Sequence, residues 1–259
     1  GMDFAIGGAT LAASISAIFT LAFLFYFLHK INESHIYNAK KYSEPNKHFL
    51  QSSFFIFLTQ LITPTAAFLS TIIIPSRLTE TGMTIHQAIA VLGQYFGMAS
   101  MIIYIPTIVT SALFHVLLIK FCSDWEMNRV QPLLNKVILV IKFVIVWGLV
   151  SAFILMFFSR EISVFVVGNE SIHFGLFYLS LAPLLSGLQS VTTITLWAIG
   201  DQKNPFIGLV LGSTVSLILY FTLIPIKGFH FFGLIIGFVA FDFIAFLWNI
   251  RPLFQTFST

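Results

Sequence analysis

The sequence IAVLGQYFGMASMIIYIPTIVTSALFHVLL, at residues 89–118, contains no Asp, Glu, Lys or Arg. A helix needs about 20 apolar residues to cross the hydrocarbon core of a bilayer. Inside that core, every backbone N–H and C=O group needs a partner within the protein, which a helix supplies. We therefore expect residues 89–118 to form a transmembrane helix.

Uncharged stretches of similar length recur along the 259-residue chain. Together with the turn signals between them, they predict seven helices, at residues 4–28, 52–75, 89–118, 137–158, 172–199, 205–226 and 232–250. The stretches are continuously apolar and lack the alternating pattern that is typical of membrane β-strands. The sequence therefore predicts an all-α fold, a polytopic transmembrane bundle of about seven helices.

The composition also favours a membrane protein, since 58% of the residues are hydrophobic and 9% are charged. A soluble domain is about 45–50% apolar and about 25% charged, so this chain has too few charges to cover a surface in water. The composition excludes a soluble enzyme, a disordered chain and, with the single cysteine Cys122, a secreted disulfide scaffold. The net charge is +3 without a basic run, so we expect no nucleic-acid partner.

The sequence holds no motif of a familiar catalytic class. A Walker loop, the HExxH pattern of zinc proteases and the GxSxG pattern of serine hydrolases are all missing from it. His115 and His173 lack the clustered spacing of metal ligands. We therefore expect the protein not to be an enzyme and to need neither a cofactor nor a metal.

The Lys and Arg residues between the predicted helices set the expected orientation, because cytoplasmic loops of membrane proteins are rich in them. Nine fall on one side, namely Lys30, Lys40, Lys41, Lys47, Lys120, Arg129, Lys136, Lys203 and Arg251. Three fall on the other side, namely Arg77, Arg160 and Lys227. We therefore expect an external N-terminus and a cytoplasmic C-terminus, in a multi-pass protein of the cytoplasmic (inner or plasma) membrane.

Two segments between helices are long enough to need an interpretation. Residues 29–51 are polar and basic, which predicts a cytoplasmic linker. Residues 119–136 mix apolar and charged side chains, which fits either an interfacial amphipathic helix or a short polar turn. The first helix lacks the basic start of a signal peptide, and Gly1 precedes Met2. We therefore expect the sequence to be part of a longer protein.

Three local patterns occur in order over about residues 60–235. They are Ile74-Pro75-Ser76-Arg77-Leu78 with Gly82; Gly93-Gln94 with Gly97-Met98-Ala99, Ile105-Pro106-Thr107 and Thr110-Ser111-Ala112-Leu113; and Gly200 to Pro205 with Gly212 and Phe232-Gly233. In these patterns the chain resembles the polysaccharide-transporter branch of the multidrug/oligosaccharidyl-lipid/polysaccharide (MOP) flippase superfamily. Within that branch it is most similar to the stage V sporulation protein B and MurJ-like lipid flippases.

The resemblance implies a fold of two lobes, of which this chain matches the second half. Residues 1–28 then form the helix that ends the first lobe, residues 29–51 the cytoplasmic linker between the lobes, and residues 52–259 a second-lobe bundle of about six helices. A missing first lobe or a second chain would complete the protein. The resemblance also implies transport of a lipid-linked oligosaccharide or cell-wall polysaccharide precursor across the membrane, by alternating access.

That activity implies membrane lipid and a lipid-linked sugar as partners, with a proton or sodium as a coupling ion. Ionisable residues in a membrane helix are the first candidates for a substrate path or coupling site. Arg77 is suited either to pairing with a phosphate or to anchoring a helix end at the interface. Lys142 either meets an anionic substrate or extends to the membrane surface. Asp242 is either a proton or sodium site or a structural, hydrogen-bonded carboxyl.

Uncharged polar residues and prolines inside the predicted helices complete the set of candidates. Gln60, Gln94 and Gln189 either line a sugar path or hold helices together by hydrogen bonds. Pro64, Pro106 and Pro183 lie within predicted helices, where each proline removes a backbone hydrogen bond and acts as a hinge or a fixed bend. The pairs Gly93/Gly97, Gly208/Gly212 and Gly233/Gly237 predict close helix packing.

Two other functions remain open. A cation-coupled multidrug antiporter of the same superfamily would give Asp242 the coupling role. A non-transporting membrane scaffold for envelope synthesis would bind enzymes without moving any substrate.

Overall fold

The structure is a computed structural model that describes residues 15–16, 18–23, 25–26 and 47–258. The chain divides into two compact units, Gly1–Phe49 and Leu50–Thr259. In the first unit, residues 15–16, 18–23 and 25–26 are helical, in agreement with the predicted helix at 4–28. Most of the predicted linker at 29–51 lies outside the described residues.

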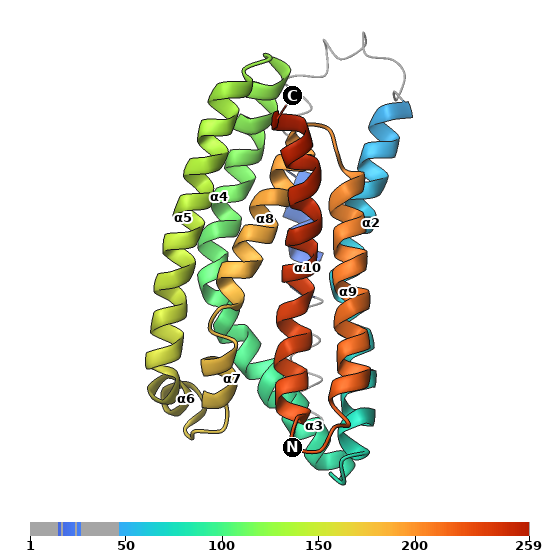
Figure 1. The fold of residues 1–259 in the computed structure, drawn as a ribbon, viewed down its shortest axis with the longest axis vertical. Helices are drawn as coiled ribbons and strands as arrows, with labels where there is room; N and C mark the ends of the chain where they lie inside the picture. The colour runs from blue at the N-terminus through green and yellow to red at the C-terminus, as the bar shows by residue number, and fades with distance from the viewer. Residues whose placement is uncertain (1–14, 17, 24, 27–46, 259) are drawn as a thin grey trace. The chain divides into compact units, whose positions relative to one another are not determined.

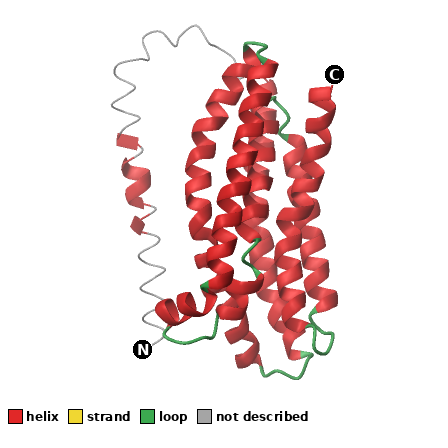
Figure 2. Ribbon diagram, turned by 60° about the vertical axis from the view of Figure 1, so that its left-hand side comes forward, coloured by secondary structure: helices red, strands yellow, loops and turns green. Residues whose placement is uncertain are grey.

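The described residues of the second unit form a bundle of helices without strands (Figures 1 and 2). The elements are α2 (Lys47–Thr79), α3 (Ile85–Leu92), the π-helix η2 (Gly93–Ala99), α4 (Ser100–Glu126), α5 (Val130–Phe157), α6 (Ser159–Val167), α7 (His173–Tyr178), α8 (Ala182–Ala198), α9 (Lys203–Leu223) and α10 (His230–Ser258). The protein therefore has an all-α fold, as the sequence predicts.

Five helical segments in the described part of the chain are long and apolar enough to cross a membrane. They are Ser53–Thr79, Ile85–Glu126, Val130–Phe157, Lys203–Leu223 and His230–Phe257. Their outward faces are rich in exposed Phe, Ile, Leu and Val side chains, which a bilayer covers and water does not. The protein is therefore a multi-pass membrane protein.

The predicted helix at 172–199 is wrong, because the structure divides it into α7 and α8 around Leu179–Leu181. Pro183 falls in the first turn of α8. A proline there has no N–H group to donate to the preceding turn, and its fixed φ suits the start of a helix. Pro183 therefore begins a helix and does not bend a continuous one, whereas Pro64 and Pro106 lie inside α2 and α4.

The alternative of an interfacial helix at 119–136 is wrong, because the segment consists of the end of α4, a short turn and the start of α5. Helix α4 continues to Glu126 and α5 starts at Val130. Between them, Asn128 adopts a left-handed backbone conformation with φ 54°, which asparagine tolerates better than most residues. A 2.5 Å ion pair between Lys136 of α5 and the nearly buried Asp124 of α4 closes the turn.

Helix α8 lies at the centre of the bundle, with α4 and α5 on one side and α10 on the other (Figure 1). Val191 and Ile194 of α8 pack with Phe121, Leu133 and other residues of α4 and α5 in one hydrophobic cluster. The opposite face of α8 meets α10 through polar side chains. This central position makes α8 the element that can carry a site inside the bundle.

Glycines bring α9 and α10 into close contact. A Cβ atom on Gly212 would overlap the backbone oxygen of Phe241, and one on Gly208 would lie 2.8 Å from Oδ1 of Asn249. The expected close packing at Gly208/Gly212 is therefore confirmed. At Gly93 and Gly97 it is wrong, because a Cβ there meets no atom within 4 Å.

Candidate functional site

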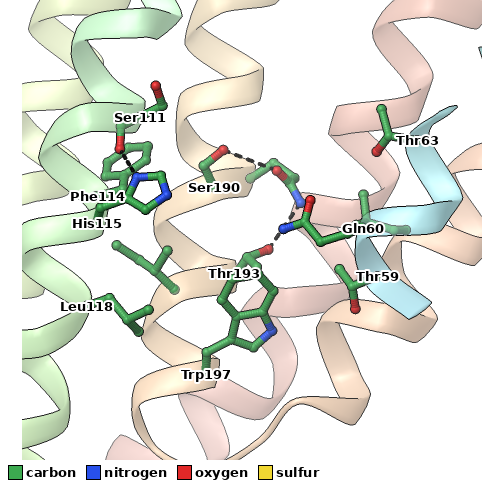
Figure 3. A pocket seen from close by; sticks show the side chains of 13 residues that line it. Thr59, Gln60, Thr63, Ser111, Phe114, His115, Leu118, Ser190, Thr193 and Trp197 are labelled. Atoms are coloured by element: carbon green, nitrogen blue, oxygen red, sulfur yellow. Dashed lines mark hydrogen bonds between the residues drawn. The ribbon is translucent and has the colours of Figure 1, made fainter. Parts of the chain in front are cut away.

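A cavity of about 270 Å³ opens between α2, α4, α8 and α9 (Figure 3). Its walls are Thr59, Gln60, Thr63, Ser111, Phe114, His115, Leu118, Gln189, Ser190, Thr193, Ile194, Trp197 and Leu209. In α2, α4 and α8, the lining residues recur every three or four positions, which places them on one face of the helix, and α9 contributes Leu209. The cavity is thus bounded by one face of each helix.

The α8 wall is held by a network of uncharged hydrogen bonds. Nε2 of Gln189 donates to Oγ1 of Thr193 at 3.1 Å, and the hydroxyl of Ser190 donates to Oε1 of Gln189 at 3.4 Å. Nδ2 of Asn249, on α10, donates to the same Thr193 oxygen at 3.1 Å. The network fixes the amide of Gln189 and ties the cavity wall to α10.

Asn249 anchors this network from behind the wall. Its side chain is fully buried, and Gly208 of α9 leaves the space that it fills. Oδ1 of Asn249 has no hydrogen-bond partner among the described residues, and neither has the buried Nε1 of the lining residue Trp197. A buried polar atom without a partner costs about 1–3 kcal/mol, and both atoms are closed off from the cavity.

Helices α2 and α4 supply the other two walls. Figure 3 shows Gln60 extending from α2 toward the hydroxyl of Thr193. On α4, Nδ1 of His115 lies 2.7 Å from the carbonyl oxygen of Ser111, so that nitrogen carries the ring proton and donates it. In the neutral form of the ring, Nε2 is then the nitrogen that accepts hydrogen bonds.

The cavity is neutral and rich in hydrogen-bonding groups. None of its lining residues is Asp, Glu, Lys or Arg, and the amides and hydroxyls on its walls both donate and accept hydrogen bonds. Such a lining does not neutralise an ion, but it can replace the water around an uncharged polar group. The arrangement therefore fits a ligand with many hydroxyl or amide groups.

A second, apolar groove of about 260 Å³ lies between α2 and α9. Its walls are Leu58, Leu61, Ile62, Thr65, Ala66, Leu69, Phe206, Val210, Ser213 and Leu217. Adjacent residues of α2, Gln60 and Leu61, belong to the polar cavity and to the apolar groove respectively. Helix α2 therefore separates a polar space from an apolar one.

The structure brings together only two of the candidate residues, Gln60 and Gln189, which face the same cavity. Gln94 is partly buried in the π-helix η2, away from the lining. At the end of α2, Arg77 donates from Nη1 to both oxygens of Glu80, at 2.7 and 3.0 Å, and stacks 3.5 Å from the ring centre of Phe221. These contacts occupy Arg77 in holding the end of α2.

Asp242 lies inside the bundle, on the face of α10 that is turned away from solvent. Its side chain is 8% exposed, and the structure gives its carboxyl no hydrogen bond or ion pair among the described residues. The ring of Tyr104, on α4, packs against Phe238, one turn before Asp242 on α10, with 6.1 Å between the ring centroids. Asp242 is not part of the cavity lining.

Lys142 is exposed on α5 and does not line the cavity. We expect Lys142→Met to change the free energy of unfolding by less than about 0.5 kcal/mol, because surface substitutions usually do so. Thermal unfolding in detergent is the measurement. A clearly larger loss would show that Lys142 makes a contact that the bundle needs.

The sequence does not predict the role of Asn249, nor that His115 faces the cavity. A signal was present for the α8 wall, because Gln189, Ser190, Thr192, Thr193 and Thr195 interrupt an uncharged stretch at helical spacing. Asn249 is a single polar residue near the end of a predicted helix and gave no such pattern. In the part of the chain that the structure describes, no three His, Cys, Asp or Glu side chains are grouped as metal ligands.

Comparison with known proteins adds no relative. A scan against protein-family models found no match, and searches of curated proteins and of solved structures found no significant match.

Proposed function

We propose that this protein is a membrane transporter, a flippase that moves a lipid-linked oligosaccharide or polysaccharide precursor across the cytoplasmic membrane. The observation that carries the proposal is the position of α2, with a neutral polar cavity on one side and an apolar groove on the other. An amphiphile with a sugar head and a hydrocarbon tail has the same two halves. The sequence patterns at residues 74–113 and 200–233 support the same assignment.

The polar cavity suits the sugar head. Sugar hydroxyls both donate and accept hydrogen bonds, as do the amides of Gln60 and Gln189, and the indole of Trp197 adds an apolar ring to the wall. Pockets for drug-sized ligands measure roughly 300–1,000 Å³, so a cavity of about 270 Å³ holds part of a saccharide. In this proposal, a first lobe or a second chain forms the facing wall of the path.

The apolar groove suits the tail. It follows α2 from Leu58 to Leu69, which is about 16 Å at 1.5 Å per helical residue. Keeping a hydrocarbon chain in this groove leaves only the polar head to be moved through the bundle. The head and tail would then pass on opposite faces of one helix.

Translocation by the purified full-length protein tests the proposal. A fluorescent polyprenyl diphosphate–linked N-acetylglucosamine is incorporated into proteoliposomes, and a membrane-impermeant quencher reports which leaflet holds the label. We expect the protein to exchange the label between leaflets faster than protein-free vesicles do. No exchange under any proton or sodium gradient, with protein that is folded and fully reconstituted, would rule out the flippase.

A cation-coupled multidrug antiporter is the second candidate, and the burial of Asp242 favours it. A carboxyl at the centre of a membrane helix costs on the order of 2.5–3.5 kcal/mol by insertion scales, and here no partner among the described residues offsets that cost. An antiporter predicts export of apolar cations driven by a proton or sodium gradient, and resistance to those compounds in cells. A flippase predicts neither.

For either candidate function, Asp242→Asn tests whether Asp242 couples transport to an ion gradient or only packs inside the bundle. The amide has the shape of the carboxyl but cannot bind or release a proton, so we expect transport to lose its dependence on the ion gradient while downhill exchange continues. Tyr104→Phe, which keeps the ring and removes the neighbouring hydroxyl, is the matched control for local packing. If Asp242→Asn leaves the gradient dependence unchanged, Asp242 is a structural residue.

A further inference from the structure

Helix α6 differs from its neighbours in direction. It follows α5 directly and lies across the long axis of the bundle, at the end of α5 opposite the α4–α5 turn (Figures 1 and 2). It is too short to cross a bilayer, which takes about 20 residues. Its place at the end of a spanning helix puts it near the membrane surface.

The side of α6 that points away from the bundle carries large apolar side chains. Ser159, Ser163 and the partly buried Ile162 and Val167 face the bundle, whereas Val164, Phe165 and Val166 point outward. The side chain of Phe165 is 91% exposed. In water this exposed apolar face would favour aggregation, whereas lipid would cover it.

Hydrogen bonds hold the helix in this orientation. The hydroxyl of Ser163 donates to the carbonyl oxygen of Asn169 at 2.7 Å and accepts from the N–H of Ile172 at 3.3 Å. Gly168 ends the helix with φ 80°, a conformation that glycine adopts without strain. The outward direction of Phe165 is therefore fixed by the fold.

The outward face of α6 continues the lipid-facing surface of α5. Phe153 and Phe157, in the last turns of the spanning segment, are 57% and 62% exposed, and Phe158 follows them at 52%. After the exposed Arg160 and Glu161, the exposed apolar side chains resume at Val164, Phe165 and Val166. The surface that the bilayer covers on α5 thus extends onto α6.

We propose that α6 is an interfacial membrane helix, which inserts Phe165 into the boundary between headgroups and acyl chains of the leaflet at its end of the bundle. Interfacial helices bury their apolar face about 5–10 Å into that boundary. The occupant of this face is lipid, and the assignment is independent of what the protein transports.

The charges on α6 indicate that insertion depends on apolar contact and not on anionic lipid. Arg160 pairs with Glu170 at 2.5 Å, which cancels both charges. Glu161, also exposed, leaves the helix with no excess of positive charge. A polybasic helix would require anionic headgroups, whereas α6 is expected to insert equally well among zwitterionic ones.

Spin-label accessibility in vesicles tests this inference on the full-length protein. A nitroxide is attached at Phe165→Cys in a Cys122→Ser background, and its collisions with oxygen and with a water-soluble nickel chelate are compared. Val146→Cys, 63% exposed in the middle of α5, is the lipid-facing reference. Asn128→Cys, in the α4–α5 turn, is the aqueous reference.

We expect the label at position 165 to favour oxygen over the chelate, as at position 146, in vesicles with and without anionic lipid. Because the label itself is apolar, a second variant carries it at Val164→Cys with Phe165→Asp, and there we expect a shift toward the chelate. Chelate accessibility at position 165 equal to that at position 128 would overturn the inference. So would a label shielded from both reagents, which would mean that protein covers α6.

Discussion

Replacing Gly212 with alanine is expected to destabilise the protein by about 2–3 kcal/mol, near the upper end of the cost of overpacking. The added Cβ would overlap the carbonyl oxygen of Phe241, which belongs to the backbone of α10 and cannot rotate away. Helices α9 and α10 would then have to move apart. Their close contact holds Asn249 in place, and Asn249 in turn ties the α8 wall of the cavity to α10. Thermal unfolding in detergent, followed by size-exclusion chromatography, measures the loss.

The matched control is Gly97→Ala, which makes the same chemical change where a Cβ meets no atom within 4 Å. We expect the free energy of unfolding of this variant to lie within about 0.5 kcal/mol of the parent's, as is usual for surface substitutions. Equal destabilisation by the two variants would mean that the contact between α9 and α10 is not what Gly212 provides.

The double variant Gln60→Leu/Gln189→Leu is expected to lower translocation of a lipid-linked sugar about tenfold or more. Each leucine keeps the approximate size of the side chain and removes hydrogen bonds worth about 0.5–1.5 kcal/mol each, and 1.4 kcal/mol corresponds to a factor of ten. The initial rate of leaflet exchange in proteoliposomes is the measurement.

Gln94→Leu is the control for that variant, because Gln94 lies in η2 and does not line the cavity. We expect it to transport at the parent rate within about twofold. Gln189→Leu also removes the hydrogen bond to Thr193, so its melting temperature is measured in parallel. A double variant that is folded and transports at the parent rate would exclude the cavity from the substrate path.

The helices could be predicted from the sequence because the membrane imposes a strong and simple rule. Uncharged stretches of about 20 residues must be helical to satisfy their backbone, and the structure has spanning helices at five of the predicted positions. The break at Leu179–Leu181 was missed because Pro183 is compatible with either a kink or a helix start. Which one forms depends on packing that a single sequence does not contain.

The candidate site was predictable only in part, for a geometric reason. A polar residue in a membrane helix is visible in the sequence, so Gln60 and Gln189 were found, but the rotation of each helix about its axis is not. Gln94 and Lys142 are also polar residues in predicted membrane helices, but neither lines the cavity in the structure. Asn249 was missed because its role depends on the space left by Gly208 on another helix.

Photocrosslinking from two adjacent positions of α2 tests whether the sugar head and the hydrocarbon tail pass on opposite faces of that helix. A photoreactive amino acid replaces Gln60, which faces the polar cavity, or Leu61, which faces the apolar groove. Each variant is irradiated with polyprenyl diphosphate–linked N-acetylglucosamine, and mild acid then cleaves the bond between sugar and diphosphate. We predict that the adduct at position 60 retains the sugar and the adduct at position 61 retains the hydrocarbon chain. Adducts of the same kind at both positions, or none at either, would contradict the account.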